Sequence, residues 1–291
     1  MILDGHIHRM VASKEREPFL EQLDAAGVSG GVVMSLPPAT FEAIGETAPA
    51  EARLEDVLYW CRPREELYPV FWVDPLEGDA LSQVERAADE GIAAFKIICD
   101  RFYPGDERCL RVLAAMAEAG KPVLFHSGIL WDAKPPGQYN RPVNFEALLE
   151  VPGLRFSMAH ISWPWTDELI AVCGKFLNAR AHRAEGVPEL FVDTTPGTPP
   201  IYRREALTRL FTVGYDVAGN VFFGSDCLAP GYGSEHARTW IDRDRQILAD
   251  LGAEAAVIER VFAGNLRRFL GLEERATDYA IPTPGTAPAS D

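Results

Sequence analysis

The sequence predicts an α/β fold, a (β/α)8 or TIM barrel that forms a single domain with extra helices at its C-terminal end. Eight short apolar or β-branched runs alternate with longer amphipathic stretches almost to the end of the chain, as is typical of parallel strands buried on both faces. The length of 291 residues suits such a barrel, which takes about 250 residues. Eight β-then-α units in succession leave a closed barrel or a very wide open sheet, and we expect the barrel.

The predicted strands are each bounded by Gly, Pro or Asp. They cover residues 2–8, 31–35, 68–73, 93–98, 122–126, 155–160, 190–194 and 221–225. Helices are predicted between them, among them 76–90, 107–119, 166–177 and 205–213, and two closing helices follow at 235–251 and 254–270. The helix at 107–119 has the clearest boundaries, because Asp106 is a good N-cap and Gly120 a plausible C-cap. The domain is expected to span residues 1–276, and the Pro/Thr/Ala-rich tail at 277–291 is expected to be disordered or loosely packed.

Composition and charge narrow the class of partner. The net charge of −15 argues against nucleic acid and anionic membranes as partners, but it does not indicate the substrate. The partner that we expect is a small-molecule substrate, and a homo-oligomer is compatible with the sequence. Five scattered cysteines without a Cys-x-x-Cys pair indicate a reduced, cytoplasmic protein. The sequence shows neither a signal peptide nor an apolar run of membrane-spanning length.

Histidines gather at the predicted ends of strands, where the active-site side chains of such barrels project. His6 and His8 close the first strand, His126 the fifth and His160 the sixth, and Asp226 follows the eighth. Residues two apart on a strand point to the same side, so His6 and His8 both face the barrel mouth. This pair alone fits a divalent metal such as zinc or two ordinary strand histidines equally well. Five metal-type residues at strand ends favour the metal site.

Five motifs in this order carry a resemblance to a known family. They are Asp4-Gly5-His6-Ile7-His8, Phe125-His126-Ser127-Gly128, Met158-Ala159-His160, Phe223-Gly224-Ser225-Asp226 and Val261-Phe262-Ala263-Gly264-Asn265. Over nearly its whole length the chain resembles the amidohydrolase superfamily, in the branch of amidohydrolase-2 proteins and aminocarboxymuconate-semialdehyde decarboxylase. The resemblance implies a site for one or two divalent metals, preferably zinc, with manganese and iron as alternatives. It makes His6, His8, His126 and Asp226 ligands, and His160 a ligand of a second metal or a polarising group.

Lys96 lies on the predicted fourth strand among apolar residues, where an unpaired lysine is costly. The resemblance to binuclear members of the superfamily implies a carbamylated lysine that bridges two metals. The alternatives are a free amine that acts in catalysis or binds an anionic substrate, and a structural ion pair.

Three residues in the predicted rim of the mouth are candidates for substrate binding. Arg203, or its neighbour Arg204, is suited to clamp a substrate carboxylate in a bidentate fashion, although a surface arginine at a helix start is the commoner outcome. Trp163 packs against a ring substrate or caps the barrel, and Tyr202 precedes the arginine pair.

These features predict a metal-dependent hydrolase that acts on a small-molecule amide, lactone or ester through a metal-activated water. In that hypothesis Asp226 orients the water and transfers its proton, while His160 or a metal polarises the carbonyl. The first alternative is a metal-dependent decarboxylase of an aromatic or muconate-type acid, with Lys96 and Arg203 as carboxylate partners. The second, a barrel that only binds a ligand, is disfavoured by the complete ligand set.

Overall fold

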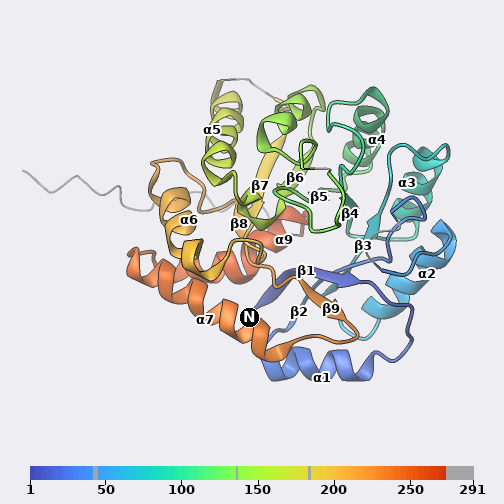
Figure 1. Cartoon of the computed structure of the whole chain (residues 1–291), viewed down its shortest axis with the longest axis horizontal. Helices are drawn as coiled ribbons and strands as arrows, with labels where there is room; N and C mark the ends of the chain where they lie inside the picture. The colour runs from blue at the N-terminus through green and yellow to red at the C-terminus, as the bar shows by residue number, and fades with distance from the viewer. Residues whose placement is uncertain (42–44, 136, 183–184, 273–291) are drawn as a thin grey trace, which may run out of the picture.

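The computed structural model describes residues 1–41, 45–135, 137–182 and 185–272, and Figure 1 shows helices arranged around one curved sheet. All strand pairs are parallel, in the order β8-β7-β6-β5-β4-β3-β2-β1-β9. The strands are β1 (Leu3–Arg9), β2 (Gly30–Met34), β3 (Leu67–Trp72), β4 (Ala94–Ile97), β5 (Val123–Phe125), β6 (Arg155–Met158), β7 (Glu189–Asp193), β8 (Val221–Phe222) and β9 (Cys227–Ala229).

The sheet closes on itself because β8 and β9 both lie beside β1. The two short strands flank a break at residues 223–226, so the predicted eighth strand at 221–225 keeps regular pairing only at Val221 and Phe222. Ile7 of β1 pairs with Cys227 of β9, and the Gly5 amide donates to the Phe223 carbonyl at 2.8 Å. The predicted (β/α)8 barrel is therefore confirmed, with its eighth strand interrupted beside Asp226.

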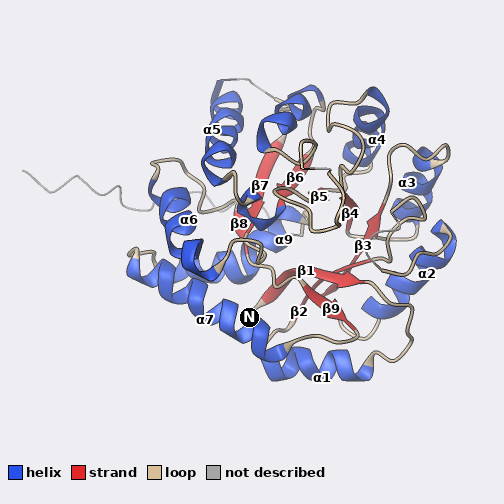
Figure 2. Cartoon of the chain, in the orientation of Figure 1, coloured by secondary structure: helices blue, strands red, loops and turns tan. Residues whose placement is uncertain are grey.

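Helices cover the outside of the sheet (Figure 2). They are α1 (Glu17–Ala26), α2 (Ala50–Cys61), α3 (Ala80–Asp89), α4 (Glu107–Glu118), α5 (Thr166–His182), α6 (Pro200–Thr212) and α7 (Ser234–Asp250). The Asp106 carboxylate accepts from the Arg108 amide at 2.9 Å, which confirms the predicted N-cap of α4. After β5 the connection is a 3-10 helix, η1 (Pro142–Glu150), in place of an α-helix. Among the described residues, no helix combines the length and the apolar character needed to span a bilayer.

The predicted closing helix at 254–270 contains a π-turn. It consists of α8 (Ala255–Glu259), the π-helical η3 (Arg260–Gly264) and α9 (Asn265–Phe269). The Val261 carbonyl in this turn accepts from the Phe223 amide at 2.9 Å. The Asn265 side chain donates to the carbonyls of Ala218 and Val221 at 2.8 and 2.6 Å. The last of the five motifs therefore anchors β8 and the turn that follows it.

The barrel interior has an apolar lower layer and a polar upper layer. The lower layer is a buried cluster that α9 completes: Leu3, Val32, Met34, Val70, Ala94, Leu124, Phe191, Phe222, Ala263, Leu266, Phe269 and Leu270. Lys96, His126 and Asp193 each follow a member of this cluster by two residues on the same strand or at its end. Since side chains two apart on a strand share a face, these three point into the barrel above the apolar layer.

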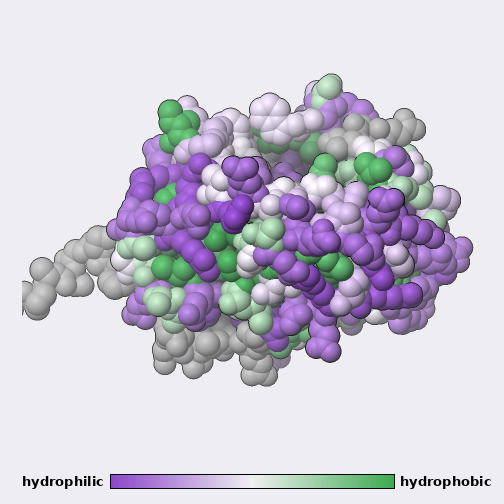
Figure 3. All heavy atoms as spheres, turned by 90° about the horizontal axis from the view of Figure 1, so that it is seen from below, coloured by the Kyte–Doolittle hydropathy of each residue, from purple (hydrophilic) through white to green (hydrophobic). Residues whose placement is uncertain are grey.

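Polar side chains cover much of one face of the molecule, and the cysteines lie inside it. Figure 3 shows mostly polar side chains on the face that lies at the bottom of Figure 1, with apolar side chains in small groups. All five cysteines are buried and have free thiols, in line with the expectation that no disulfide framework is present. The predicted tail at 277–291 lies outside the described residues.

Candidate metal centre

His6, His8 and Asp226 converge at the carboxyl-terminal edge of the sheet. His6 Nε2 lies 3.0 Å from His8 Nε2, and Asp226 Oδ1 lies 3.8 and 3.5 Å from these two nitrogens. One potential ligand atom from each residue falls within 4.8 Å of the others. Ligands about 2.0–2.1 Å from one zinc ion lie roughly 3 Å apart, so the three atoms fit around one ion.

His6 is oriented by a buried carboxylate. Its Nδ1 lies 2.5 Å from Asp193 Oδ2, at the end of β7. Asp193 Oδ1 in turn accepts from the Thr195 amide at 2.7 Å and from the Thr195 hydroxyl. The contact places the imidazole proton on Nδ1, which leaves the Nε2 lone pair directed at His8 and Asp226. A carboxylate on the far nitrogen is the usual partner of a metal-binding histidine.

His126 and His160 adjoin this trio. The His160 ring centroid lies 4.9 Å from that of His126 and 5.4 Å from that of His6. His126 Nε2 and His160 Nδ1 are both buried, and neither has a hydrogen-bond partner. Because buried polar atoms are nearly always paired in folded proteins, an unpartnered imidazole nitrogen beside the trio fits a position for a metal ligand.

A strained turn presents His160. His160, Ile161 and Ser162 follow β6 with φ of +62°, +48° and +51°, a region that costs a non-glycine residue on the order of 1–3 kcal/mol and is rarest for β-branched side chains. The Ser127 hydroxyl lies 2.7 Å from the Ala159 carbonyl and 2.8 Å from the Ser162 hydroxyl, and so braces the turn. Such strain typically collects at functional sites.

A glycine packs against the other side of His160. A Cβ on Gly197 would lie 2.7 Å from His160 Cβ and 3.0 Å from its Nδ1. Any side chain at this position would therefore displace the imidazole.

The electrostatics of the cluster favour neutral imidazoles beside an ionised carboxylate. Burial, with Lys96 and neighbouring histidines, lowers the pKa of His6 and of His126 well below the usual range. Burial also lowers the pKa of His160, against the opposing effect of Asp226. For Asp226 itself burial acts upward, but His8, His160 and His6 together hold its pKa well below the usual range. Neutral histidines and an ionised aspartate are the forms that bind a metal.

Lys96 points into the same layer and has no hydrogen-bond partner at its buried Nζ. Burial lowers the pKa of its amine to about 8, although Asp193 and Asp226 act in the opposite direction. An unpaired amine in such a place is expensive, so the geometry is suited to a bound anion or a covalent modification at Nζ.

The three predicted rim residues have different surroundings. Trp163 and the half-exposed Tyr202 stack with ring centroids 6.4 Å apart and an interplanar angle of 25°. Arg203 is fully buried, and its guanidinium forms a bidentate pair with Asp244 at 2.9 and 2.5 Å and also donates to the Thr194 carbonyl. The structure therefore brings Trp163 and Tyr202 together, and it pairs Arg203 with an internal carboxylate.

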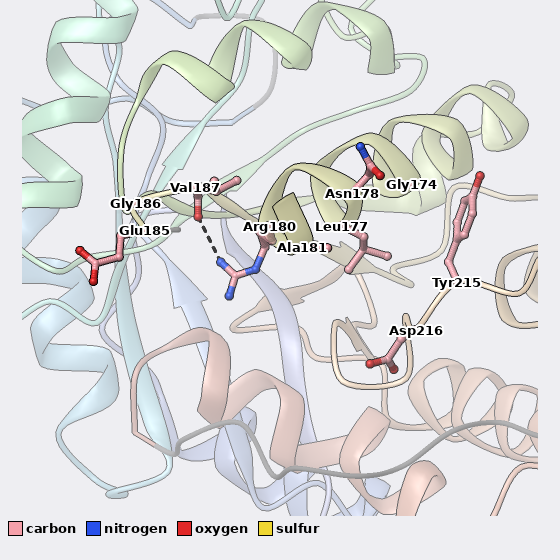
Figure 4. Close-up of a pocket in the computed structure, with 10 residues that line it drawn as sticks. All are labelled: Gly174, Leu177, Asn178, Arg180, Ala181, Glu185, Gly186, Val187, Tyr215 and Asp216. Atoms are coloured by element: carbon pink, nitrogen blue, oxygen red, sulfur yellow. Dashed lines mark hydrogen bonds between the residues drawn. The ribbon is translucent and has the colours of Figure 1, made fainter. Parts of the chain in front are cut away.

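A separate pocket lies at the opposite end of the barrel (Figure 4). It is lined by the last turns of α5, by residues 185–187 before β7 and by Tyr215 and Asp216 before β8. Its Arg180 guanidinium donates to the Val187 carbonyl at 3.1 Å. In barrels of this type the face at the amino ends of the strands serves stability, so this pocket is no rival to the histidine cluster.

Sequence reasoning assigned no role to Asp193 and Asp4. Asp193 obeys the rule that identified the histidines, a polar residue at the end of an apolar strand, and that rule alone suffices to find it. Asp4 opens the first of the five motifs, but its role has no local signal, because its contacts are with backbone amides and with Tyr232, more than 200 residues away in the chain.

The protein is a (β/α)8 barrel whose histidines and an aspartate converge at the carboxyl-terminal mouth, the face where barrel enzymes carry their active sites. The amidohydrolase family model matches residues 4–272, and the chain belongs to this family. No curated protein matches the sequence.

Several solved structures share the fold at low identity. A 2,6-dihydroxybenzoate decarboxylase from Rhizobium aligns with a TM-score of 0.62 and 13% identity, over 93% of this chain and 99% of that one. A probable 2-pyrone-4,6-dicarboxylic acid hydrolase from Acinetobacter baumannii gives 0.61 and 14%, over 93% and 99%. A dihydroorotase from Campylobacter jejuni gives 0.58 and 16%, over 94% and 84%. These neighbours catalyse different reactions, so the shared fold leaves the reaction of this chain open.

Proposed function

We propose that this protein is a metal-dependent hydrolase of a small-molecule amide, lactone or ester. The observation that carries the proposal is the convergence of His6 Nε2, His8 Nε2 and Asp226 Oδ1, with Asp193 orienting His6. His6, His8, His126 and Asp226 would hold the ion, and His160 would hold a second ion or polarise the substrate. Nitrogen and carboxylate ligands suit zinc, with manganese or iron as alternatives.

A divalent ion in this site would acidify water and polarise a carbonyl. Asp226 is suited to proton transfer, since its carboxylate is ionised, borders His8 and has a side chain that is 35% exposed toward the mouth. In the proposed reaction it takes the proton of the attacking water and returns it to the leaving group. His160 orients and polarises the carbonyl oxygen, and the stacked Trp163 and Tyr202 form one wall for the substrate.

Decarboxylation of an aromatic or muconate-type acid is the second candidate, and one observation favours it. The unpartnered Lys96 amine is a natural partner for a substrate carboxylate. Arg203, the other partner that this reaction would use, is already paired with Asp244. Hydrolysis needs no second cation, and for this reason it is the preferred reaction.

Labelled water distinguishes the two reactions. Metal-loaded protein is incubated in H2(18)O with small amides, lactones and esters, and separately with aromatic and muconate-type acids. We expect 18O in a carboxylate product, and we expect Asp226→Asn to abolish turnover. Arg86→Gln, a change at an exposed arginine of α3 that pairs with Glu51 and Glu90, should leave turnover unchanged. Release of carbon dioxide without 18O incorporation would establish the decarboxylase instead.

A further inference from the structure

The first strand contains one extra residue, and this bulge decides which side chains face the mouth. Along β1 the pairing advances from Asp4 to Ile7 while β2 advances only from Gly31 to Val33. Strict alternation would place Leu3 and Ile7 on one face. In the structure Leu3 belongs to the inner cluster and Ile7 to the outer core. The bulge therefore turns His6 and His8 inward, as bulges next to active sites commonly re-aim side chains.

Asp4 satisfies the backbone at this bulge. Its Oδ1 accepts from the His6 amide at 3.0 Å, a group that the shift of register takes out of the regular ladder. A buried amide without a partner costs roughly 1–3 kcal/mol. By accepting the hydrogen bond of the His6 amide, the Asp4 carboxylate removes this cost and stabilises the bulge. Asp4 thereby acts on the conformation of the segment that carries His6 and His8.

The same carboxylate also binds the segment that carries Asp226. Asp4 Oδ1 accepts from the Ser225 amide at 2.9 Å, and Oδ2 accepts from the Tyr232 hydroxyl at 2.9 Å. Ser225 directly precedes Asp226, which has a left-handed φ of +60°. One buried side chain therefore spans the seam where the barrel closes, and it holds the two ligand-bearing segments at a fixed separation.

Two glycines show how closely the chains approach at this point. Gly31, with φ of +151°, would place a Cβ in overlap with the Asp4 carbonyl. A Cβ on Gly5 would lie 2.5 Å from the Phe222 ring and 2.7 Å from the Phe223 carbonyl. The bulge is therefore built into the packing of three neighbouring strand segments, with Asp4 at its centre.

We infer that Asp4, locked by Tyr232, is a positioning residue that sets the separation of Asp226 from His6 and His8 and so determines the affinity for the metal. This inference rests on the metal site proposed above. Asp4 itself lies outside the trio of potential ligands and acts only through the backbone of the two segments.

The test compares removal of the carboxylate with a conservative replacement. Asp4→Ala is expected to weaken zinc binding roughly 10- to 100-fold, the usual effect of losing a residue that orients metal ligands. Asp4→Asn is expected to restore most of the affinity, because its amide oxygen still accepts from both backbone amides and its NH2 donates to the Tyr232 oxygen. Zinc affinity is measured by competition with a chromophoric chelator, and the thermal unfolding of each metal-free variant is recorded.

A matched control separates positioning from general loosening of the strand. Asp56 anchors the end of β1 through a bidentate pair with Arg9 and does not contact a ligand-bearing turn. Asp56→Ala is expected to lower the unfolding temperature while zinc affinity stays within about threefold of the wild type, the scale of one ordinary hydrogen bond. Equal zinc affinity in Asp4→Ala and wild type would overturn the inference, as would an equal loss in Asp56→Ala.

Tyr232→Phe removes the hydrogen bond from the Tyr232 hydroxyl to Asp4 Oδ2. This variant keeps the inference testable if Asp4→Ala does not fold. Loss of its hydrogen bond is expected to weaken zinc binding at least ~3-fold, whereas Tyr59→Phe, which removes a hydroxyl bonded to the distant Lys14 carbonyl, leaves it unchanged. Equal affinity in both tyrosine variants would contradict the inference. Failure of the wild type to bind zinc at all would instead refute the metal site on which it rests.

Discussion

Replacing Asp193 by asparagine tests how His6 is prepared for metal binding. In the wild type Asp193 Oδ1 accepts two hydrogen bonds from Thr195, and Oδ2 faces His6 Nδ1 at 2.5 Å. In Asp193→Asn the amide oxygen keeps the two Thr195 donors, so the NH2 group faces His6 Nδ1. A donor in that position forces the imidazole proton onto Nε2, the nitrogen that lies 3.0 Å from His8 Nε2. The isosteric change therefore selects the tautomer that cannot bind a metal, as in the aspartate-to-asparagine change of serine-protease triads.

The expected loss of zinc affinity is roughly 10- to 100-fold, equivalent to about 1.4–2.7 kcal/mol. Asp193→Ala leaves Nδ1 free to keep its proton, so it is expected to bind zinc at least as well as Asp193→Asn despite the larger change in volume. Chelator competition measures both affinities. Asp74→Asn is the matched control, because Asp74 is a buried aspartate just after β3 that binds Thr40 and Arg101. Wild-type affinity in Asp193→Asn, or much weaker binding in Asp193→Ala than in Asp193→Asn, would refute the reasoning.

Two further changes test packing and charge. A Cβ on Gly224 would overlap the Thr195 hydroxyl and lie 2.8 Å from His6 Cβ. Gly224→Ala is therefore expected to lower the free energy of unfolding by about 1–3 kcal/mol, measured by urea titration. The control is Gly231→Ala, where a Cβ meets nothing within 4 Å, and equal stability of the two variants would contradict the close packing at Gly224. Burial acts upward on the pKa of Glu189, but the Arg268 charge and hydrogen bond override it and lower the pKa. The ion pair therefore contributes stability above the unfolded pKa of about 4.3, and this contribution disappears as pH falls through the lower folded pKa. Glu189→Gln is expected to cost about 3–5 kcal/mol at neutral pH and to converge with the wild type in acid, whereas a pH-independent difference would show that the charge is not the cause.

The fold was predictable because each strand is an apolar run bounded by turn residues. That pattern located all eight strands, yet it did not predict the break in the last one. The break depends on partners distant in sequence: the Val261 carbonyl in the π-turn takes the Phe223 amide, and Asp4 takes the Ser225 amide. The residues around the break do not indicate such long-range contacts. The 3-10 helix η1 after β5 was missed as well, since periodicity is a weak signal over a short, irregular element.

For the site, the strand-end rule located His6, His8, His126, His160 and Asp226, and the structure gathers them in one cluster. The rule identifies which residues reach the mouth but not which acceptors are already present there. Arg203 was predicted as a substrate clamp, and the sequence offered no sign that Asp244, on a later helix, supplies a bidentate partner. The role of a long polar side chain at the rim therefore depends on its tertiary contacts, whereas the position at a strand end is enough to place a side chain in the mouth.

The metal content of the protein tests most directly whether the His6, His8 and Asp226 cluster holds a catalytic divalent metal, as we propose. Elemental analysis is performed on wild type and on the double variant His6→Ala/His8→Ala, both purified without chelator and then offered zinc or manganese. We expect about one or two equivalents of metal in the wild type, which is the range for a mononuclear or binuclear site, and essentially none in the double variant. Less than about a tenth of an equivalent in the wild type, unrecovered on adding either metal, or equal metal in both proteins would contradict the claim.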